Sequence, residues 1–348
     1  MNPYILATFL FGLGLGTTVT FASSHWFLAW MGLEMNTLAI LPLMAQHHHP
    51  RAVEATTKYF LMQATGAATL LFACTTNAWL TGQWDIQQMS HPVPVTLITL
   101  ALALKVGLAP LHSWLPEVLQ GLDLTTGLIL STWQKLAPLA LLLQIHPTNS
   151  TLLVVLGLTS TLVGGWGGLN QTQLRKILGY SSIAHLGWMV LVLQFSPSLT
   201  LLTLFIYIIM TLSTFLVFKL NNSTNINTLA TSWAKAPALV ALAPLMLLSL
   251  GGLPPLTGFM PKWLILQELA KQDLAATATL AALTALLSLY FYLRLSYAMA
   301  LTMSPNNTAG TTPWRLPSLQ LTMPLAVTTV ATLLLLPLAP ATTALLTL

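Results

Sequence analysis

Charged residues are scarce in this chain of 348 residues. Lys, Arg, Asp and Glu together form only 5% of the sequence, whereas hydrophobic residues form 55%. A soluble globular domain carries about 25% charged residues. The 12 basic and 7 acidic side chains are too few to cover a soluble surface, so lipid must face most of the chain. The composition therefore excludes a soluble helical protein with an apolar core and indicates a membrane protein that crosses the bilayer several times.

Cysteine is almost absent as well. The single residue, Cys74, cannot form an internal disulfide, and this chain alone cannot hold an iron–sulfur cluster, which needs several cysteine ligands. The triplet of histidines at 47–49 has no other metal ligands nearby, so we expect no metal site there. The basic residues form no run that would bind nucleic acid. We therefore predict no metal or cofactor in this chain and no nucleic-acid partner.

Long apolar runs are what the sequence has in abundance. A transmembrane helix needs about 20 apolar residues, and short connections separate the runs, so we predict one all-α transmembrane domain over 1–348. The stretch 302–320 is polar and is predicted to be a surface loop. The eleven predicted membrane segments are 3–22, 24–44, 58–80, 93–112, 124–145, 150–170, 177–195, 199–218, 237–267, 274–298 and 322–345.

The loop charges predict the orientation of the chain. Positive loops stay on the cytoplasmic or matrix side of a membrane. Loops on one side hold only Lys271, so the N-terminus is predicted on the inner side and the C-terminus on the outer side. The start, MNPYILATFLFGLGLG, has no transit-peptide pattern, and we expect no segment to be removed. The loops of the inner side hold Arg51, Lys58, Arg175, Lys176, Lys219, Lys235 and Arg315.

A short motif occurs twice. Residues 107–116 read GLAPLHSWLP and residues 252–261 read GLPPLTGFMP, an offset of 145 residues. Five predicted crossings separate the copies, so they would run in opposite directions, as in an inverted repeat with broken helices near the midplane. Backbone groups freed by a helix break need protein or water partners, so both places should be buried in protein and polar. The predicted helix-breaking residues are Pro110, Pro254, Pro255 and Pro261.

Four charged residues fall inside predicted membrane segments: Glu34, Lys105, Lys135 and Lys262. Placing all four at the bilayer centre costs on the order of 10 kcal/mol. An ion pair between Glu34 and one lysine could serve packing alone, but one glutamate cannot neutralise three lysines. Desolvation lowers the pKa of a lysine and a nearby carboxylate raises it, so such a row can take up and release protons. We therefore predict a proton relay through these four residues.

Two histidines are possible further members of the relay. His112 follows the first broken motif, and His185 lies in the predicted segment 177–195. Histidine titrates near neutral pH, although a lone histidine is more often a hydrogen-bonded packing residue. The glycines of GLGLG at 12–16 and GGWGG at 164–168 are typical of close helix packing rather than of a phosphate-binding loop.

Several long motifs resemble one known family. LHSWLPEVLQ, LNQTQLRKILGYSSIAHLGWM and GGLPPLTGFMPKWLILQEL are similar to the antiporter-like subunits in the membrane arm of respiratory complex I (NADH–ubiquinone oxidoreductase), in the form that vertebrate mitochondria encode. These subunits are related to multisubunit sodium/proton antiporters. The resemblance covers essentially the whole chain. It implies two inverted five-helix repeats, here about 3–145 and 150–298, followed by a final helix at about 322–345.

The resemblance also assigns roles. It implies a glutamate–lysine pair at Glu34 and Lys105, a connecting lysine at Lys135 and a terminal group at Lys262. It implies a multi-pass protein of the mitochondrial inner membrane, with the N-terminus in the matrix and the C-terminus on the intermembrane-space side. Its partners would be the lipid bilayer and other membrane-arm subunits, including neighbouring antiporter-like subunits. FMN, iron–sulfur clusters and ubiquinone would lie on other subunits.

Two features depart from the larger antiporter-like subunits. Residues 121–131 hold neither the proline nor the histidine that those subunits carry there, and Gln173 stands where they often have an acidic residue. Details of their relays therefore do not transfer to this chain directly.

The sequence favours a subunit that translocates protons, driven by redox chemistry elsewhere in the complex. One alternative is a subunit of a sodium/proton antiporter without redox coupling, which would share every buried charge. The other is a scaffold that only holds adjacent pumping subunits.

Overall fold

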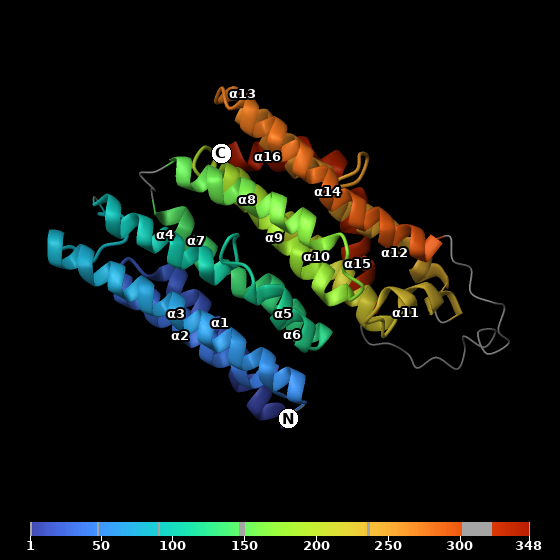
Figure 1. The fold of residues 1–348 in the computed structure, drawn as a ribbon, viewed down its shortest axis with the longest axis horizontal. Coiled ribbons are helices and arrows are strands. Elements are labelled where there is room, and N and C mark those ends of the chain that lie inside the picture. Colours follow the sequence, from blue (N-terminus) through green and yellow to red (C-terminus); the bar gives the residue numbers. More distant parts are fainter. Residues whose placement is uncertain are drawn as a thin grey trace. The chain divides into compact units, whose positions relative to one another are not determined.

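The fold is helical throughout the described part of the chain. The computed structural model describes residues 2–46, 49–89, 91–145, 150–234, 237–300 and 322–347. Within these ranges every regular element is a helix (Figure 1), and the β contacts are two isolated bridges, His25–Asp85 and Gln173–Asn225. The predicted loop at 302–320, together with His47, His48, Lys235 and Arg315, lies outside the described residues.

The chain divides into two compact units, residues 1–156 and 157–348. The elements of the first unit are α1 (Pro3–Ala22), α2 (Trp26–Met44), α3 (Pro50–Thr81), α4 (Pro92–Val106), α5 (Trp114–Gly121), α6 (Leu124–Thr132), the 3₁₀ turn η1 (Trp133–Lys135), α7 (Leu136–Gln144) and the start of α8 (Ser150–Gly168).

Successive helices of the first unit pack on one another. Helix α2 lies between α1 and α3, α3 also contacts α4 and α5, and α7 contacts α1 and α4. Glycines permit the closest approach: a Cβ built on Gly16 would lie 2.9 Å from the Gly32 carbonyl oxygen, and one on Gly32 would lie 2.9 Å from that of Gly16. Small residues bring membrane helices together in this way because burial of apolar surface gives no driving force in lipid.

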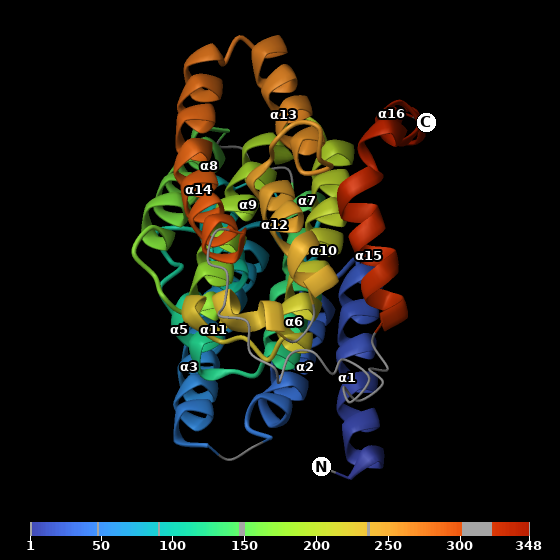
Figure 2. The ribbon, with the colours of Figure 1, turned by 90° about the vertical axis from the view of Figure 1, so that its right-hand side faces the viewer.

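The second unit is arranged around α10. This helix contacts α9, α12, α13, α15 and α16, while α14 packs along α12 (Figure 2). The elements of this unit are the rest of α8, α9 (Leu174–Leu193), α10 (Pro197–Leu220), α11 (Ile226–Ala230), η2 (Thr231–Ala234), α12 (Pro237–Gly251), α13 (Phe259–Lys271), α14 (Ala275–Ala300), α15 (Thr322–Leu334), η5 (Leu336–Leu338) and α16 (Ala339–Thr347).

The helices match the predicted membrane segments. Among the described residues, seven helices are long and apolar enough to cross a membrane: α1, α2, the run from α6 through α7, α8, α9, α10 and α14. The pair α15 and α16, bent by 64°, is an eighth candidate. The remaining predicted segments correspond to the 32-residue α3 and to two interrupted helices, α4–α5 and α12–α13. The prediction of a polytopic helical membrane protein is confirmed, with an approximate number of crossings.

The first copy of the repeated motif interrupts a helix. Helix α4 ends before Gly107, which has the left-handed conformation (φ 90°). The Leu108 amide then donates back to the Ala103 carbonyl at 2.9 Å, the bond that closes a helix with a left-handed glycine. The Trp114 indole donates to the Leu104 carbonyl at 3.1 Å, so a backbone group freed by the break has a protein partner.

The second copy repeats this backbone geometry. Gly252 has φ 80° after the end of α12, and the Leu253 amide donates to the Leu248 carbonyl at 3.2 Å. The peptide bonds Ala109–Pro110 and Pro254–Pro255, at equivalent positions, are both cis. Pro110, Pro254 and Pro255 thus lie inside the breaks, whereas Pro261 lies in the first turn of α13, where a helix tolerates proline.

We expect Gly107→Ala to destabilise the protein more than Gly82→Ala. Both glycines have positive φ, at 90° and 72°, so each alanine costs about 1–2 kcal/mol of backbone strain. A Cβ at Gly107 would also lie 2.8 Å from Leu115 Cδ1, whereas nothing lies within 4 Å of one at Gly82. Thermal unfolding of the purified assembly should show the larger fall for Gly107→Ala. Equal falls for the two variants would contradict the crowding argument.

Candidate functional site

The structure buries Lys105 and Lys135 in the first unit. Lys105 lies in the last turn of α4, directly before the break at Gly107, and Lys135 ends the 3₁₀ turn η1. Their relative exposures are 5% and 2%. Lysine is almost never this deeply buried without a specific environment, so the surroundings of these two side chains define the candidate site.

A local interruption of the helix presents Lys135. The span 124–144 is helical on both sides of η1 but tightens to a 3₁₀ turn at Trp133–Lys135. Pro138 follows three residues later, has no N–H to offer the Gln134 carbonyl, and its ring crowds that carbonyl. A 3₁₀ stretch inside a helix often marks a functional position. Here the sequence explains the interruption directly, through the proline.

Lys105 and Lys135 line the same cavity. Its volume is about 20 Å³, and a site needs about 10–15 Å³ of such volume to hold one water molecule. The cavity therefore has room for about one water between the two lysines. Its walls come from α2, α3, α4, α5, α6, η1 and α7, with the residues Leu33, Asn36, Thr37, Tyr59, Gln63, Lys105, Val106, Trp114, Leu115, Leu130, Gln134, Lys135 and Pro138.

The polar atoms around the cavity fit a water molecule. The Gln63 side-chain amide donates to the Lys105 carbonyl at 3.3 Å, and that of Gln134 donates to the Asn36 carbonyl at 3.3 Å. Two buried atoms, Lys105 Nζ and Asn36 Oδ1, have no hydrogen-bond partner in the described part of the chain. Buried polar atoms are almost always hydrogen-bonded to protein or ordered water, so these two atoms are suitable partners for a water molecule in the cavity.

Glu34 adjoins the cavity through Thr37. The Thr37 hydroxyl lies 2.9 Å from Glu34 Oε2 and 2.8 Å from the Glu34 backbone carbonyl, and Thr37 is part of the cavity wall. The Glu34 carboxylate also interacts electrostatically with Lys105 and with Tyr59. The structure thus brings together three of the sequence-predicted residues, Glu34, Lys105 and Lys135.

Lys262 belongs to the second unit and has a different environment. Its ammonium donates to the Gly251 carbonyl at 2.6 Å, at the C-terminal end of α12. The C-terminal end of a helix carries partial negative charge and attracts cations. The break between α12 and α13 therefore gives Lys262 a specific anchor across the left-handed Gly252.

Hydroxyl groups form further hydrogen bonds at this second break. Ser249 donates to the Thr332 carbonyl of α15 at 3.0 Å, and the Thr257 hydroxyl donates to the same carbonyl. The Gly258 amide in turn donates to Ser249 Oγ at 3.3 Å. Ser249, Thr257 and Thr332 are all buried. Hydrogen bonds therefore join the end of α15 to the break between α12 and α13.

The two histidines occupy separate places. His112 lies in the first break, where its ring interacts with the Pro110 backbone and Nδ1 has no hydrogen-bond partner among the described residues. His185, in the second unit, places Nδ1 2.8 Å from the Ser181 carbonyl and packs against Tyr207 with ring centroids 5.5 Å apart. Neither histidine is among the residues that line the lysine cavity.

Sequence reasoning missed the polar residues of the cavity wall. A criterion based on buried charge does not identify neutral residues, and four neutral residues belong to the wall: Asn36, Tyr59, Gln63 and Gln134. A signal was present for two: Asn36 lies two residues after Glu34, and Gln134 precedes Lys135. Among the described residues no group of three or more His, Cys, Asp or Glu side chains could hold a metal ion.

Comparisons with known proteins place the chain in a family. A family model described as "NADH:quinone oxidoreductase/Mrp antiporter, TM" matches residues 23–288, and one described as "NADH dehydrogenase subunit 2 C-terminus" matches 289–343. The chain is 76% identical to NADH-ubiquinone oxidoreductase chain 2 of Tetraodon nigroviridis, with 98% of each chain covered. It is 72% identical to the Salmo salar protein of the same name, with 100% of both covered.

Solved structures share the fold. A chain of the respiratory complex I from Thermus thermophilus superposes with a TM-score of 0.84 at 28% identity, covering 99% of this chain and 80% of that one. A chain of the Mrp complex from Dietzia sp. DQ12-45-1b reaches a TM-score of 0.79 at 17% identity, covering 95% and 74%, and shows likeness of fold alone. The matches over the whole length establish that this chain belongs to the NADH-ubiquinone oxidoreductase chain 2 family.

Proposed function

We propose that the chain is a core subunit of the proton-translocating NADH:ubiquinone oxidoreductase of the mitochondrial inner membrane, and that it moves protons through buried lysines. Family membership supports the first statement. One observation carries the second: Lys105 and Lys135 line one cavity that also has neutral polar side chains in its wall and room for about one water.

Within the first unit, Lys105 receives a proton while Glu34 stabilises its charged form. A change in the position or charge of Glu34 then favours release, because an ammonium loses stability when its counter-charge is withdrawn. The proton passes through the cavity to Lys135. The hydrogen bonds of Gln63 and Gln134 to the backbone hold the cavity walls in register.

Lys262 is the proposed terminal group of the relay in the second unit. The Gly251 carbonyl stabilises the charged form of Lys262. When Lys262 releases its proton, the proton passes toward the outer side or to a neighbouring subunit. His112 and His185 are proposed as auxiliary proton carriers, because histidine changes charge near neutral pH.

The energy and the cofactors come from elsewhere in the complex. We assign FMN, the iron–sulfur clusters and ubiquinone to other subunits, in keeping with the single, buried Cys74. Their redox chemistry reaches this chain as an electrostatic or conformational change passed on by neighbouring membrane-arm subunits. The same proposal places the N-terminus in the matrix and the C-terminus in the intermembrane space, on the evidence of the loop charges.

The proposal includes two inverted repeats, about 3–145 and 150–298, followed by a final helix at about 322–345. The matching backbone geometry at Gly107 and Gly252 supports a shared origin of the two breaks. A subunit of a sodium/proton antiporter without redox coupling remains the second candidate, because the matching family model includes Mrp antiporters. Sodium-driven proton transport by the purified chain in vesicles would favour it.

Lys105→Met and Glu34→Gln should each lower NADH-driven proton pumping, with the assembly intact. The Lys105 variant removes a proton carrier and should lower proton transfer through this chain by at least about 100-fold, the lower end of what a positioned proton-transfer group contributes. Pumping is measured by a pH-sensitive dye in vesicles that contain the complex, alongside NADH oxidation. Lys271→Met is the matched control, since Lys271 is 61% exposed and pairs with Glu268 at 3.4 Å. Unchanged pumping in both test variants, with the assembly intact, would reject the relay.

Lys262→Arg separates the two roles of Lys262. Arginine can donate to the Gly251 carbonyl as the lysine does, but it does not release its proton in proteins. We expect the variant to assemble, oxidise NADH and lose most proton pumping, whereas Lys262→Met should also lower thermal stability. Normal pumping by Lys262→Arg would show that Lys262 only caps α12.

A further inference from the structure

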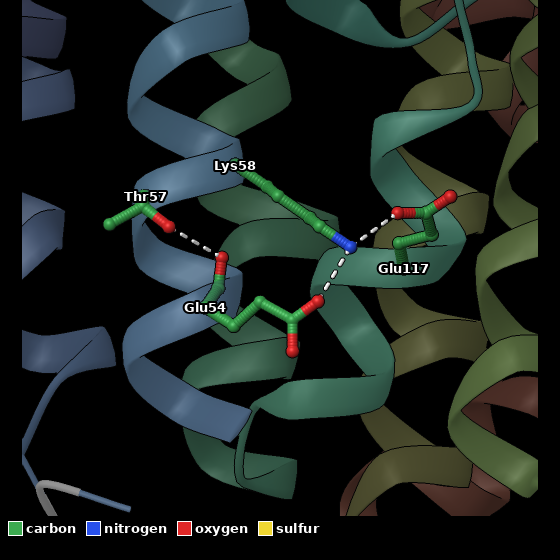
Figure 3. A network of polar contacts seen from close by, with 4 residues as sticks. All are labelled: Glu54, Thr57, Lys58 and Glu117. Atoms are coloured by element: carbon green, nitrogen blue, oxygen red, sulfur yellow. Dashed lines mark hydrogen bonds and ion pairs between the residues drawn. The ribbon is translucent and has the colours of Figure 1, made fainter. Parts of the chain in front are cut away.

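A second cluster of charges lies in the first unit, outside the relay. Lys58 of α3 bridges two carboxylates, with Nζ 2.8 Å from Glu54 Oε1 and 2.9 Å from Glu117 Oε2. Figure 3 shows the ammonium between the two carboxylates, one from its own helix and one from α5. The side chains of Lys58, Glu54 and Glu117 are 42%, 63% and 52% exposed. Only the bond to Glu117 joins two elements.

The cluster lies near the end of a helix that is longer than a membrane crossing requires. With 32 residues, α3 is about 48 Å long at the usual rise per residue, whereas the hydrocarbon core is about 30 Å thick. Glu54 and Lys58 lie in the first nine residues of α3. They can therefore remain hydrated at the membrane boundary while the rest of the helix crosses the bilayer.

The same two elements also form a wall of the lysine cavity. Tyr59 and Gln63 of α3, and Trp114 and Leu115 of α5, line it. Tyr59 directly follows Lys58 and meets Trp114 edge to face, with ring centroids 5.7 Å apart at 62°. From the surface inward, the joint between α3 and α5 therefore presents an ion pair, then an aromatic pair, and then the cavity.

We propose that this joint is the gate through which the cavity of Lys105 and Lys135 exchanges protons with the nearer aqueous side. The Lys58–Glu117 ion pair is its latch, and the Tyr59–Trp114 pair is its plug. The proposal rests on the proton relay proposed above and adds the residues that control entry to it. Helix α5 suits the moving part, because it has only eight residues and begins just after the helix break.

The two ends of α5 have different contacts. Its last residue, Gly121, touches α3 so closely that an added Cβ would lie 2.7 Å from Ala55 Cβ. At the other end, Trp114 lines the cavity and donates one hydrogen bond to the Leu104 carbonyl. With Gly121 as the pivot, Glu117 holds the middle of α5 against α3. Exposed ion pairs are weak, so water or a charged group on an adjacent subunit can replace this one and release the Trp114 end.

Thiol labelling of the assembled complex tests the gate. Leu130→Cys, in a Cys74→Ala background, places one thiol in the cavity wall, and Leu130 is 2% exposed. Because the closed cavity holds about one water, methyl methanethiosulfonate reaches this thiol only through opening. We expect Glu117→Gln to speed labelling about two- to fivefold, the factor that corresponds to the loss of an exposed ion pair.

Glu54→Gln is the matched control. It removes an equally short bond to Lys58, but within α3, so labelling should stay at the parent rate. The charge exchange Lys58→Glu with Glu117→Lys should restore slow labelling. Equal labelling of the Glu117→Gln and parent proteins overturns the gate, and so does equal acceleration by Glu54→Gln. Leu33→Cys, on α2 in the same cavity, replaces the reporter if the Leu130→Cys complex does not assemble.

The labelling result is independent of the relay itself. Faster labelling in Glu117→Gln together with normal pumping in Lys105→Met would retain the gate as a route into the cavity and reject the relay. Unchanged labelling together with loss of pumping in Lys105→Met would reject the gate and retain the relay.

Discussion

The need to satisfy polar groups in apolar surroundings governs this structure. A helix crossing lipid can open only where other groups take over its backbone hydrogen bonds. At the first break the Trp114 indole donates a hydrogen bond to the Leu104 carbonyl. At the second break the Lys262 ammonium donates one to the Gly251 carbonyl. Each break is held by a left-handed glycine of the repeated motif. The buried Lys105 precedes the first break, and the half-buried Lys262 follows the second.

The two breaks share one backbone geometry, but charged residues occupy different places around them. The offset of 145 residues that relates the motifs also relates Glu117 to Lys262. In the first unit this position faces the surface and pairs with Lys58, while the buried charge lies before the break, at Lys105. In the second unit the corresponding residue, Lys262, donates a hydrogen bond to the Gly251 carbonyl at the end of α12. The same local fold thus positions a boundary ion pair in one unit and a proposed proton carrier in the other.

The cavity lined by Lys105 and Lys135 has room for a water molecule that could link the two side chains. Neutral polar side chains of α2, α3 and η1 lie around the lysines, and the volume suits about one water. A water at that place could donate to Asn36 Oδ1 and accept from Lys105 Nζ, neither of which has a protein partner among the described residues. One water is the smallest bridge through which the ammonium of one lysine can pass a proton to the neutral amine of the other. It also explains why access from outside would require a gate.

The sequence by itself determined the class of fold, the membrane segments, the two helix breaks and which charged residues fall inside those segments. These follow from local physics: apolar run length, proline and glycine chemistry, and the cost of charge in lipid. Only the tertiary structure decided that Lys105 and Lys135 share a cavity, that Lys262 caps α12, and that Asn36, Tyr59, Gln63 and Gln134 belong to the site. Neutral polar side chains leave no distinct signal in a sequence, because their role depends on which helices pack together, and that packing joins residues far apart in the chain.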